Sequence, residues 1–78
     1  MTTETITTTL DLKGLSCPLP IVKTARALKE LPSGAVVEVL ATDPGSREDF
    51  IAWSTSTGND LLDASREDGV FRYVIRKR

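Results

Sequence analysis

The stretch Leu10–Lys23, LDLKGLSCPLPIVK, contains the strand-to-helix turn from which the fold can be worked out. Leu10 and Leu12 alternate with polar residues, which is the pattern of a half-buried strand. Gly14 and the two residues after it turn the chain. From Pro18 to Leu31 apolar residues then recur at helical spacing, with charged residues opposite them. The apolar positions are Ile21, Val22, Ala25, Leu28 and Leu31. The stretch therefore predicts a strand followed by an amphipathic helix.

The remaining elements follow from turn signals and periodicity. Pro32-Ser33-Gly34 ends the first helix, and the β-branched run 35–41 predicts a strand. A second helix is expected to start at Asp43-Pro44, with Asp43 as its cap and Pro44 at its first position. Ser46 with Asp49 offers a rival start as a capping box. This helix, with Phe50, Ile51 and Trp53 on its apolar side, ends at Gly58-Asn59. Two strands, 61–66 and 70–76, flank the hairpin signal Asp68-Gly69.

The element order β-α-β-α-β-β predicts an α+β fold. Alternation in the strands gives the sheet one dry and one wet face, so both helices must lie on the same side. We therefore expect a two-layer α/β sandwich with a four-stranded mixed sheet, and a right-handed crossover in the first β-α-β unit. The expected core residues of the sheet are Leu10, Leu12, Val37, Val39, Phe71, Tyr73 and Ile75. Val36, Leu40 and Val74 fall on the wet face, as an irregularity or a contact patch.

Length and composition restrict the class of protein. The 78 residues allow one domain, 1–78, of which about residues 1–6 are expected to fray. The net charge of −1 argues against a nucleic-acid binder, which usually carries a basic patch. No apolar run approaches a membrane span, and no signal-peptide pattern begins the chain, so we expect a cytoplasmic protein. A monomer that binds its partners transiently is the default expectation. The chain has no histidine and one cysteine, which excludes Cys-His catalysis and an internal disulfide.

Cys17, the single cysteine, lies between a predicted strand and a predicted helix. The carboxyl end of a strand in an open α/β sheet is a common position for a site. The positive end of the helix is expected to lower the pKa of the thiol. Pro18 at the first helical position and Pro20 in the first turn occupy places where a helix can spare an N–H. The N–H groups of Leu19, Ile21 and Val22 are then the expected donors to the sulfur. A buried, structural cysteine is the open alternative.

Four motifs together resemble the TusA/SirA family of small sulfur-carrier proteins. They are Cys17-Pro18-Leu19-Pro20, Pro32-x-Gly34, Asp43-Pro44 followed by Asp49, and Phe71-Arg72-Tyr73 with Arg76-Lys77. The resemblance implies a fold like the C-terminal domain of translation initiation factor three, and a persulfide on Cys17. A cysteine desulfurase or rhodanese-type donor would load it, and an acceptor protein would receive the sulfur. Family destinations are tRNA thiolation, molybdenum cofactor synthesis and sulfur oxidation, among which the sequence does not choose.

The resemblance describes a sulfurtransferase-type carrier rather than a stand-alone, multiple-turnover enzyme, and no cofactor or metal is expected. Gly14 would shape the turn that supports the motif. Lys13, Lys23, Arg26 and Asp43 could contact partner proteins, although the three cations could instead form a solvated face and Asp43 a helix cap. Two other functions stay open. One is a non-catalytic protein- or RNA-interaction module, and the other is a thiol redox regulator.

Overall fold

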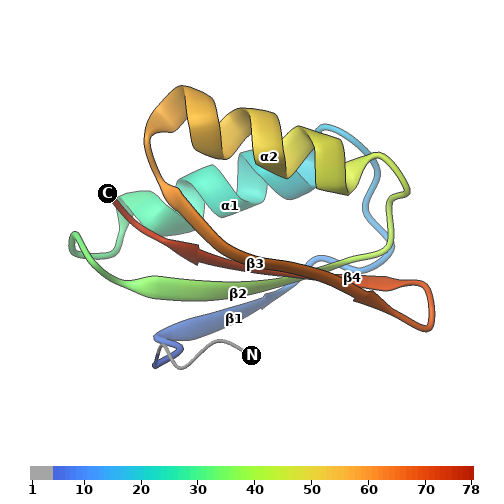
Figure 1. Ribbon diagram of the computed structural model, residues 1–78, viewed down its shortest axis with the longest axis horizontal. Coiled ribbons are helices and arrows are strands. Elements are labelled where there is room, and N and C mark those ends of the chain that lie inside the picture. The colour runs from blue at the N-terminus through green and yellow to red at the C-terminus, as the bar shows by residue number, and fades with distance from the viewer. Residues whose placement is uncertain (1–4) are drawn as a thin grey trace.

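The computed structural model describes residues 5–78, and their six elements follow the predicted order (Figure 1). The elements are β1 (Thr8–Asp11), α1 (Leu19–Lys29), β2 (Val36–Ala41), α2 (Ser46–Thr57), β3 (Asp60–Glu67) and β4 (Val70–Arg76). Residues 1–6 are expected to fray, and residues 1–4 of this segment lie outside the described part of the chain. Neither α1 nor α2, the helices of the described part, is long and apolar enough to cross a membrane.

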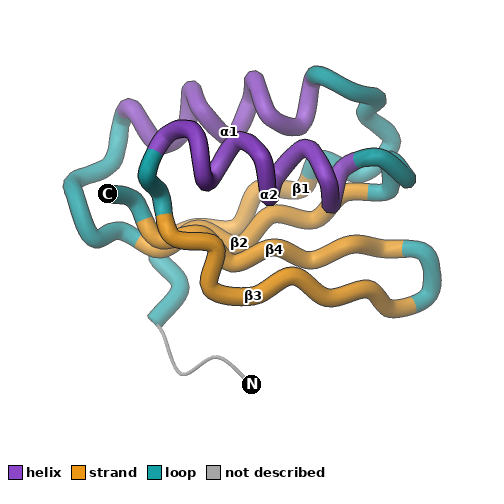
Figure 2. The backbone as a smooth tube through the Cα atoms, turned by 45° about the horizontal axis from the view of Figure 1, so that its top comes forward, coloured by secondary structure: helices purple, strands orange, loops and turns teal. Residues whose placement is uncertain are grey.

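The sheet has the strand order β1-β2-β4-β3, and both helices cover one of its faces (Figures 1 and 2). β1 runs parallel to β2, and β2 pairs antiparallel with β4. The β3–β4 hairpin turns at Asp68 (φ 51°) and Gly69 (φ 78°). Two successive positive φ angles are what the predicted two-residue hairpin turn requires. The expected α+β fold, with its mixed four-stranded sheet and two helices on one face, is confirmed.

The core lies between the sheet and the helices. Tyr73 of β4 stacks on Phe50 of α2 at a ring-centroid distance of 4.5 Å, and Trp53 meets Phe50 edge-on at 6.0 Å. Such aromatic pairs stabilise a core beyond their area of burial. All seven predicted core residues of the sheet belong to this cluster, with Leu10 and Phe71 partly buried at its margin. The alternation in the strands therefore identified the dry face of the sheet correctly.

The first helix packs on the sheet through only part of its predicted apolar side. Its buried line is Pro20, Thr24 and Leu28, which are spaced four residues apart. Val22, predicted to face the core, keeps 39% of its surface exposed. A proline and a threonine thus lie on the sheet-facing side together with the predicted Leu28, and Ile21 packs against the same core. The hydrophobic pattern therefore identified part of the buried side but missed Pro20 and Thr24, which are not typical core residues of a helix.

The second helix begins later than predicted and its expected caps are wrong. Gly45 is the N-cap residue, and Ser46 is the first helical residue. Asp43 instead accepts a hydrogen bond from the Gly45 N–H at 3.2 Å, which closes a turn before the helix and leaves Pro44 outside it. Ser46 does not form a capping box either, because its hydroxyl bonds to Tyr73. Ile51, expected on the apolar side, is 41% exposed.

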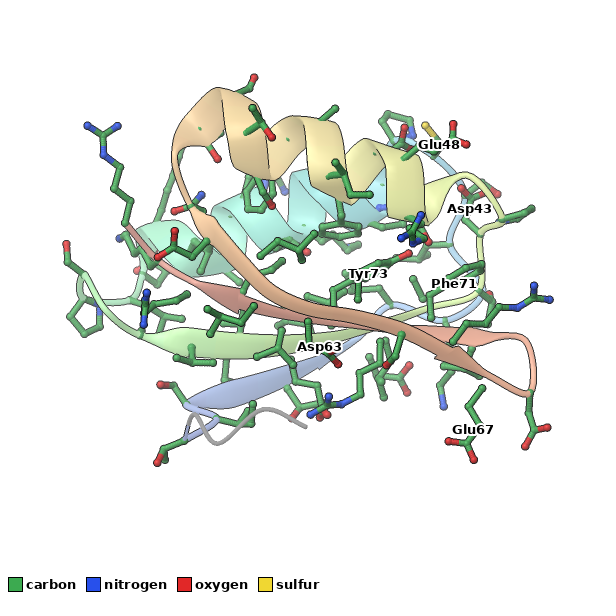
Figure 3. The ribbon with its side chains drawn as sticks, in the orientation of Figure 1. Asp43, Glu48, Asp63, Glu67, Phe71 and Tyr73 are labelled. Carbon is green, nitrogen blue, oxygen red and sulfur yellow. The ribbon has the colours of Figure 1, made fainter. Side chains whose placement is uncertain are left out.

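The helix-free face of the sheet is partly dry. Val36 and Val74, expected among its wet residues, are buried, with 3% and 0% exposure. Glu38 and Asp63 flank Val74 from the neighbouring strands, and Arg72 forms ion pairs with both carboxylates. Figure 3 shows Asp63 on the side of the sheet away from the helices. This charged cluster closes over Val74, so the valine is not an exposed contact patch.

Candidate functional site

The loop between β1 and α1 is tied to the segment that follows β2. Leu12 continues the β1–β2 pairing by donating its N–H to the Leu40 carbonyl at 2.8 Å. Gly14 then turns the chain with a φ of 85°, a conformation in which glycine is favoured. Its N–H donates to Oγ1 of Thr42 at 2.9 Å. The predicted role of Gly14 in the turn thus has a structural basis, and the tie brings the two loops together.

Cys17 is exposed at the start of α1, so the interpretation of this residue as a buried structural thiol is wrong. The helix begins at Leu19, and Pro18 is its N-cap residue rather than its first residue. Pro20 lies in the first turn and is buried, and the Cys17–Pro18 peptide bond is cis. Both prolines therefore occupy positions where a helix loses no internal hydrogen bond.

Two of the three N–H groups expected to donate to the sulfur have other acceptors. The Leu19 N–H donates to the Ser16 carbonyl at 2.9 Å, and the Val22 N–H donates to the Pro18 carbonyl at 3.1 Å. Of the three, only Ile21 keeps an N–H without an acceptor among residues 5–78. Direct backbone stabilisation of a thiolate is thus weaker than the sequence predicted.

The thiol has acidic neighbours, and the predicted direction of its pKa shift is wrong. A side-chain hydrogen bond with Asp49 is the largest cause of a raised Cys17 pKa, and the negative charges of Asp49 and Asp43 add to it. A carboxylate beside a thiol disfavours the thiolate because the two negative charges repel. The acids of the neighbouring loop and helix therefore raise the pKa of the thiol, opposite to the direction expected from the helix start alone.

The two acids are held by the start of α2. Asp43 is fixed by its bond to the Gly45 N–H, and Asp49 donates its own N–H to the Gly45 carbonyl at 3.2 Å. Ser46 and Tyr73 share a buried hydrogen bond of 2.6 Å that attaches the helix to β4. Figure 3 shows Asp43 and Glu48 at this end of α2, with Tyr73 between the sheet and the helices. The acidic side of the site therefore has a rigid support.

The other predicted contact residues are exposed on the segment from Lys13 to Arg26 that contains the thiol. Lys13 lies 3.9 Å from Asp11 in an exposed ion pair, which contributes little to stability. Lys23 and Arg26 are exposed on α1, and neither is brought against Cys17. Leu19, at 44% exposure, and Val22 form an apolar surface on the first turn of the same helix. Exposed apolar area next to a reactive group is typical of a docking surface.

Sequence reasoning missed the role of Asp49 and the Thr42 tie. The sequence alone indicates Asp49 only as part of a capping box and as a match to the family motif. The order of the elements contained the missing signal, because the carboxyl ends of parallel strands meet at one edge of a sheet. Since β1 and β2 are such a pair, the acids that follow β2 are placed near the thiol that follows β1.

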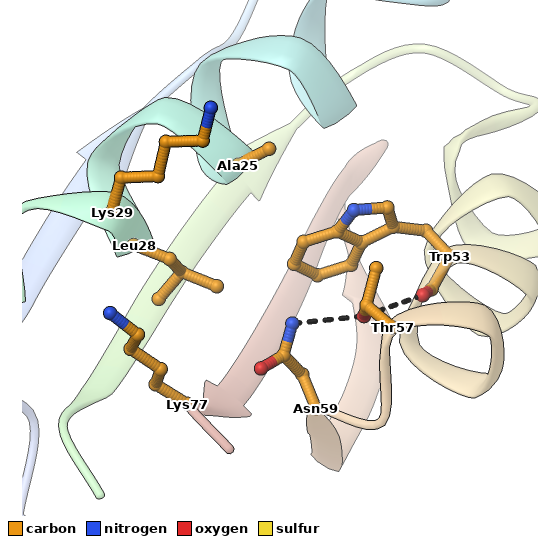
Figure 4. Close-up of a pocket in the computed structure, with 7 residues that line it drawn as sticks. All are labelled: Ala25, Leu28, Lys29, Trp53, Thr57, Asn59 and Lys77. Atoms are coloured by element: carbon orange, nitrogen blue, oxygen red, sulfur yellow. Dashed lines mark hydrogen bonds between the residues drawn. The ribbon is translucent and has the colours of Figure 1, made fainter. Parts of the chain in front are cut away.

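A pocket of about 210 Å³ lies between the C-terminal halves of the two helices, away from the thiol. In Figure 4, Trp53 and Thr57 of α2 face Ala25 and Leu28 of α1 across it. Asn59 donates a hydrogen bond to Thr57 at 2.9 Å at its edge. Cys17 is exposed and does not line this pocket.

Residues 8–77 match the family model described as sulfurtransferase TusA. This chain belongs to the TusA family. The match covers β1 through β4, and with it the whole loop that carries Cys17. The predicted resemblance to the TusA/SirA family is therefore confirmed.

Relatives within the TusA family match along most of their length. A putative sulfur carrier protein YrkI of Bacillus subtilis is 50% identical over 68 residues, which cover 87% of this chain and 91% of the relative. The sulfur carrier protein TusA of Allochromatium vinosum is 47% identical over 68 residues, covering 87% and 90%. The crystal structure of a SirA-like protein from Desulfitobacterium hafniense aligns with a TM-score of 0.78 at 30% identity, covering 88% of this chain and 95% of that one.

Proposed function

We propose that this protein carries sulfane sulfur as a persulfide on Cys17 and relays it between partner proteins. A sulfur-carrier role follows from membership of the TusA family. The observation that supports Cys17 as the carrying atom is its exposure at the strand-to-helix turn, in a chain that contains no second cysteine. A carrier without a second thiol cannot discharge its sulfur into an internal disulfide. Residues 1–78 would act as one carrier domain.

The relay consists of two thiol exchanges. The Cys17 thiolate attacks the outer sulfur of a donor persulfide, a new S–S bond forms, and the S–S bond of the donor breaks. The donor leaves as a thiolate that takes up a proton, and Cys17 holds the outer sulfur as a persulfide. An acceptor cysteine thiolate then attacks that outer sulfur and releases Cys17. Neither step requires an external oxidant, because the sulfane sulfur is passed on without net oxidation.

The surface around Cys17 is suited to a transient protein partner. Leu19 and Val22 offer apolar area, and Lys23 with Arg26 offers positive charge on the next turns of α1. Charged residues at the margin of an interface mainly accelerate association. We assign these residues to docking of the sulfur donor, which would be a cysteine desulfurase or a rhodanese-type protein. The carrier itself would be a cytoplasmic monomer that makes no direct contact with nucleic acid.

Intact-mass measurement tests the carrier role. The protein is incubated with a cysteine desulfurase and L-cysteine, and in parallel with a rhodanese and thiosulfate. We expect a mass gain of one sulfur atom that dithiothreitol removes and that is absent in Cys17→Ser. An equal gain in Cys17→Ser, or no gain with either donor, would overturn the proposal. RNA binding that is indifferent to Cys17→Ser would favour the interaction module instead.

A charge-reversal pair tests the docking surface. Lys23→Glu should slow sulfur loading at low salt, because it places a negative charge beside the approaching donor. Lys29→Glu is the matched control, since Lys29 is exposed on the same helix about 9 Å farther along its axis. Equal loading rates for the two variants would show that the donor does not approach over the first turns of α1.

A further inference from the structure

The pocket between the C-terminal halves of α1 and α2, about 210 Å³ in volume, is lined by the single tryptophan of the chain (Figure 4). Trp53 is half-buried, and its ring meets Phe50 edge-on at a centroid distance of 6.0 Å. Across the pocket it faces Ala25 and Leu28 of α1. An apolar cavity of about 150 Å³ is large enough to hold benzene. The pocket therefore has the volume and the apolar wall that one aromatic ring needs.

The charged residues that line this pocket are both cations. Lys29 is exposed in the last turn of α1, and Lys77 follows β4 and donates a hydrogen bond to the Leu31 carbonyl. Neither lysine forms an ion pair within residues 5–78, and Glu30, although next to Lys29 in the chain, does not line the pocket. The C-terminus of a helix carries only about half a negative charge. Two ammonium groups therefore leave positive charge in excess here.

The polar groups of the pocket have spare hydrogen-bond donors, whereas their side-chain oxygens are already engaged. The Thr57 hydroxyl donates to the Trp53 carbonyl at 2.8 Å and accepts from the Asn59 amide at 2.9 Å. The Asn59 side-chain oxygen accepts the Arg78 N–H at 2.9 Å. The indole N–H of Trp53 has no acceptor within the part of the chain that the structure describes. A ligand that accepts hydrogen bonds and carries negative charge, as a carboxylate does, matches these groups.

We propose that this pocket binds a small aromatic carboxylate, with the ring against Trp53 and Leu28 and the carboxylate beside the ammonium groups of Lys29 and Lys77. Sites for drug-sized ligands usually have about 300–1,000 Å³, so this smaller pocket takes one ring rather than a nucleotide. A neutral ring gains the apolar contact without the ion pairs, and a cationic ring is repelled. Cys17 does not line the pocket, so the site is separate from the proposed sulfur relay.

The fluorescence of Trp53 reports binding directly, because the chain contains no other tryptophan. The full chain is titrated at neutral pH with benzoate, benzamide and benzylamine, which each carry one ring and differ in charge. We expect a saturable change with benzoate, a weaker one with benzamide, and none with benzylamine over the same concentrations. Equal binding of benzoate and benzylamine would overturn the assignment of an anionic ligand. If benzoate gives no saturable change, and the amide NMR signals of the pocket residues do not shift, the site itself is refuted.

Two exposed lysines of α1 provide a matched pair of variants. Lys29→Gln removes a charge at the pocket, whereas Lys23→Gln removes one that does not line it. We expect the Kd for benzoate to rise roughly fivefold in Lys29→Gln and in Lys77→Gln, the factor for one charge pair about 4 Å apart in water, and to stay unchanged in Lys23→Gln. An unchanged Kd in both pocket variants, or an equal rise in Lys23→Gln, contradicts the proposal. Cys17→Ser should bind benzoate like the wild type, so this outcome does not depend on whether Cys17 carries sulfur.

Discussion

The buried hydrogen bond between Ser46 and Tyr73 supports the start of α2, and its removal should destabilise the whole fold. The two hydroxyl oxygens are 2.6 Å apart, and the residues have exposed fractions of 1% and 0%. Tyr73→Phe keeps the ring that stacks on Phe50 and removes only the hydroxyl group. Ser46→Ala removes the other partner. Each single substitution leaves one buried hydroxyl without a partner.

The expected magnitude follows from that unpaired group. A buried polar group that loses its partner costs about 1–3 kcal/mol, whereas removal of both partners is close to neutral. We expect each single variant to lose about 2 kcal/mol of unfolding free energy, and the double variant to lose less than the sum of the two. In a domain of this size, about 2 kcal/mol lowers Tm by roughly 10 °C.

Urea denaturation monitored by circular dichroism gives the free energies, and calorimetry gives Tm. The four proteins form a double-mutant cycle whose coupling free energy isolates the hydrogen bond. The reasoning is refuted if both single variants stay within about 0.5 kcal/mol of the wild type, or if their effects add in the double variant. Alkylation of Cys17 in the same variants reports whether loosening of α2 also shifts the pKa of the thiol.

Three further substitutions test the account of the fold. Thr24→Val should raise unfolding free energy by about 1 kcal/mol in urea, because Oγ1 of Thr24 is buried without a partner; a loss of stability contradicts this. Arg72 holds the pKa of Glu38 below its usual value, so the ionised carboxylate stabilises the fold at neutral pH. This contribution is lost as the pH falls from about 4, near the pKa of an unfolded glutamate, through the lower pKa of Glu38 in the folded protein. The stability difference between wild type and Glu38→Gln should therefore shrink in acid, and a constant difference across pH would show that the ion pair is not its source. Gly58→Ala should lower Tm, at a cost of about 1 kcal/mol, because φ is 77° at this helix end and an added Cβ would lie 3.0 Å from Arg78; an unchanged melting curve would remove this argument.

The sheet could be predicted from the sequence because strand alternation and turn residues are local signals. Leu10 and Leu12 mark the dry face of the first strand by spacing alone. Asp68-Gly69 specifies the hairpin between the last two strands, whatever the position of that hairpin in the sheet. The burial of Pro20 and Thr24 on the first helix could not be predicted in this way. Thr24 is buried although it is polar, because tertiary packing of the helix on the sheet outweighs the identity of one side chain.

At the site, the sequence indicated the position of Cys17 but not its electrostatic surroundings. The helix start argued for a stabilised thiolate, whereas Asp49, 32 positions later in the chain, is the first cause of a raised pKa. A helix end contributes partial charge, and a carboxylate beside the thiol contributes a full one. Deciding between them requires the distance between two loops, which depends on the register of β1 on β2 and on the Thr42 tie. Neither the strand register nor the Thr42 hydrogen bond can be recognised from the local sequence pattern.

The pairing of β2 with β4 has a consequence for how the protein is made. Val36 of β2 pairs with Arg76, and Ala41 pairs with Phe71, so one central strand completes its ladder only with residues near position 76. β1, which leads into the thiol loop, pairs only with β2 and so depends on the same event. Long-range pairing of this kind slows folding, because the loop-closure entropy must be overcome before the contacts stabilise the chain. During translation, β2 can therefore complete its pairing with β4 only after residue 76 has emerged from the ribosome.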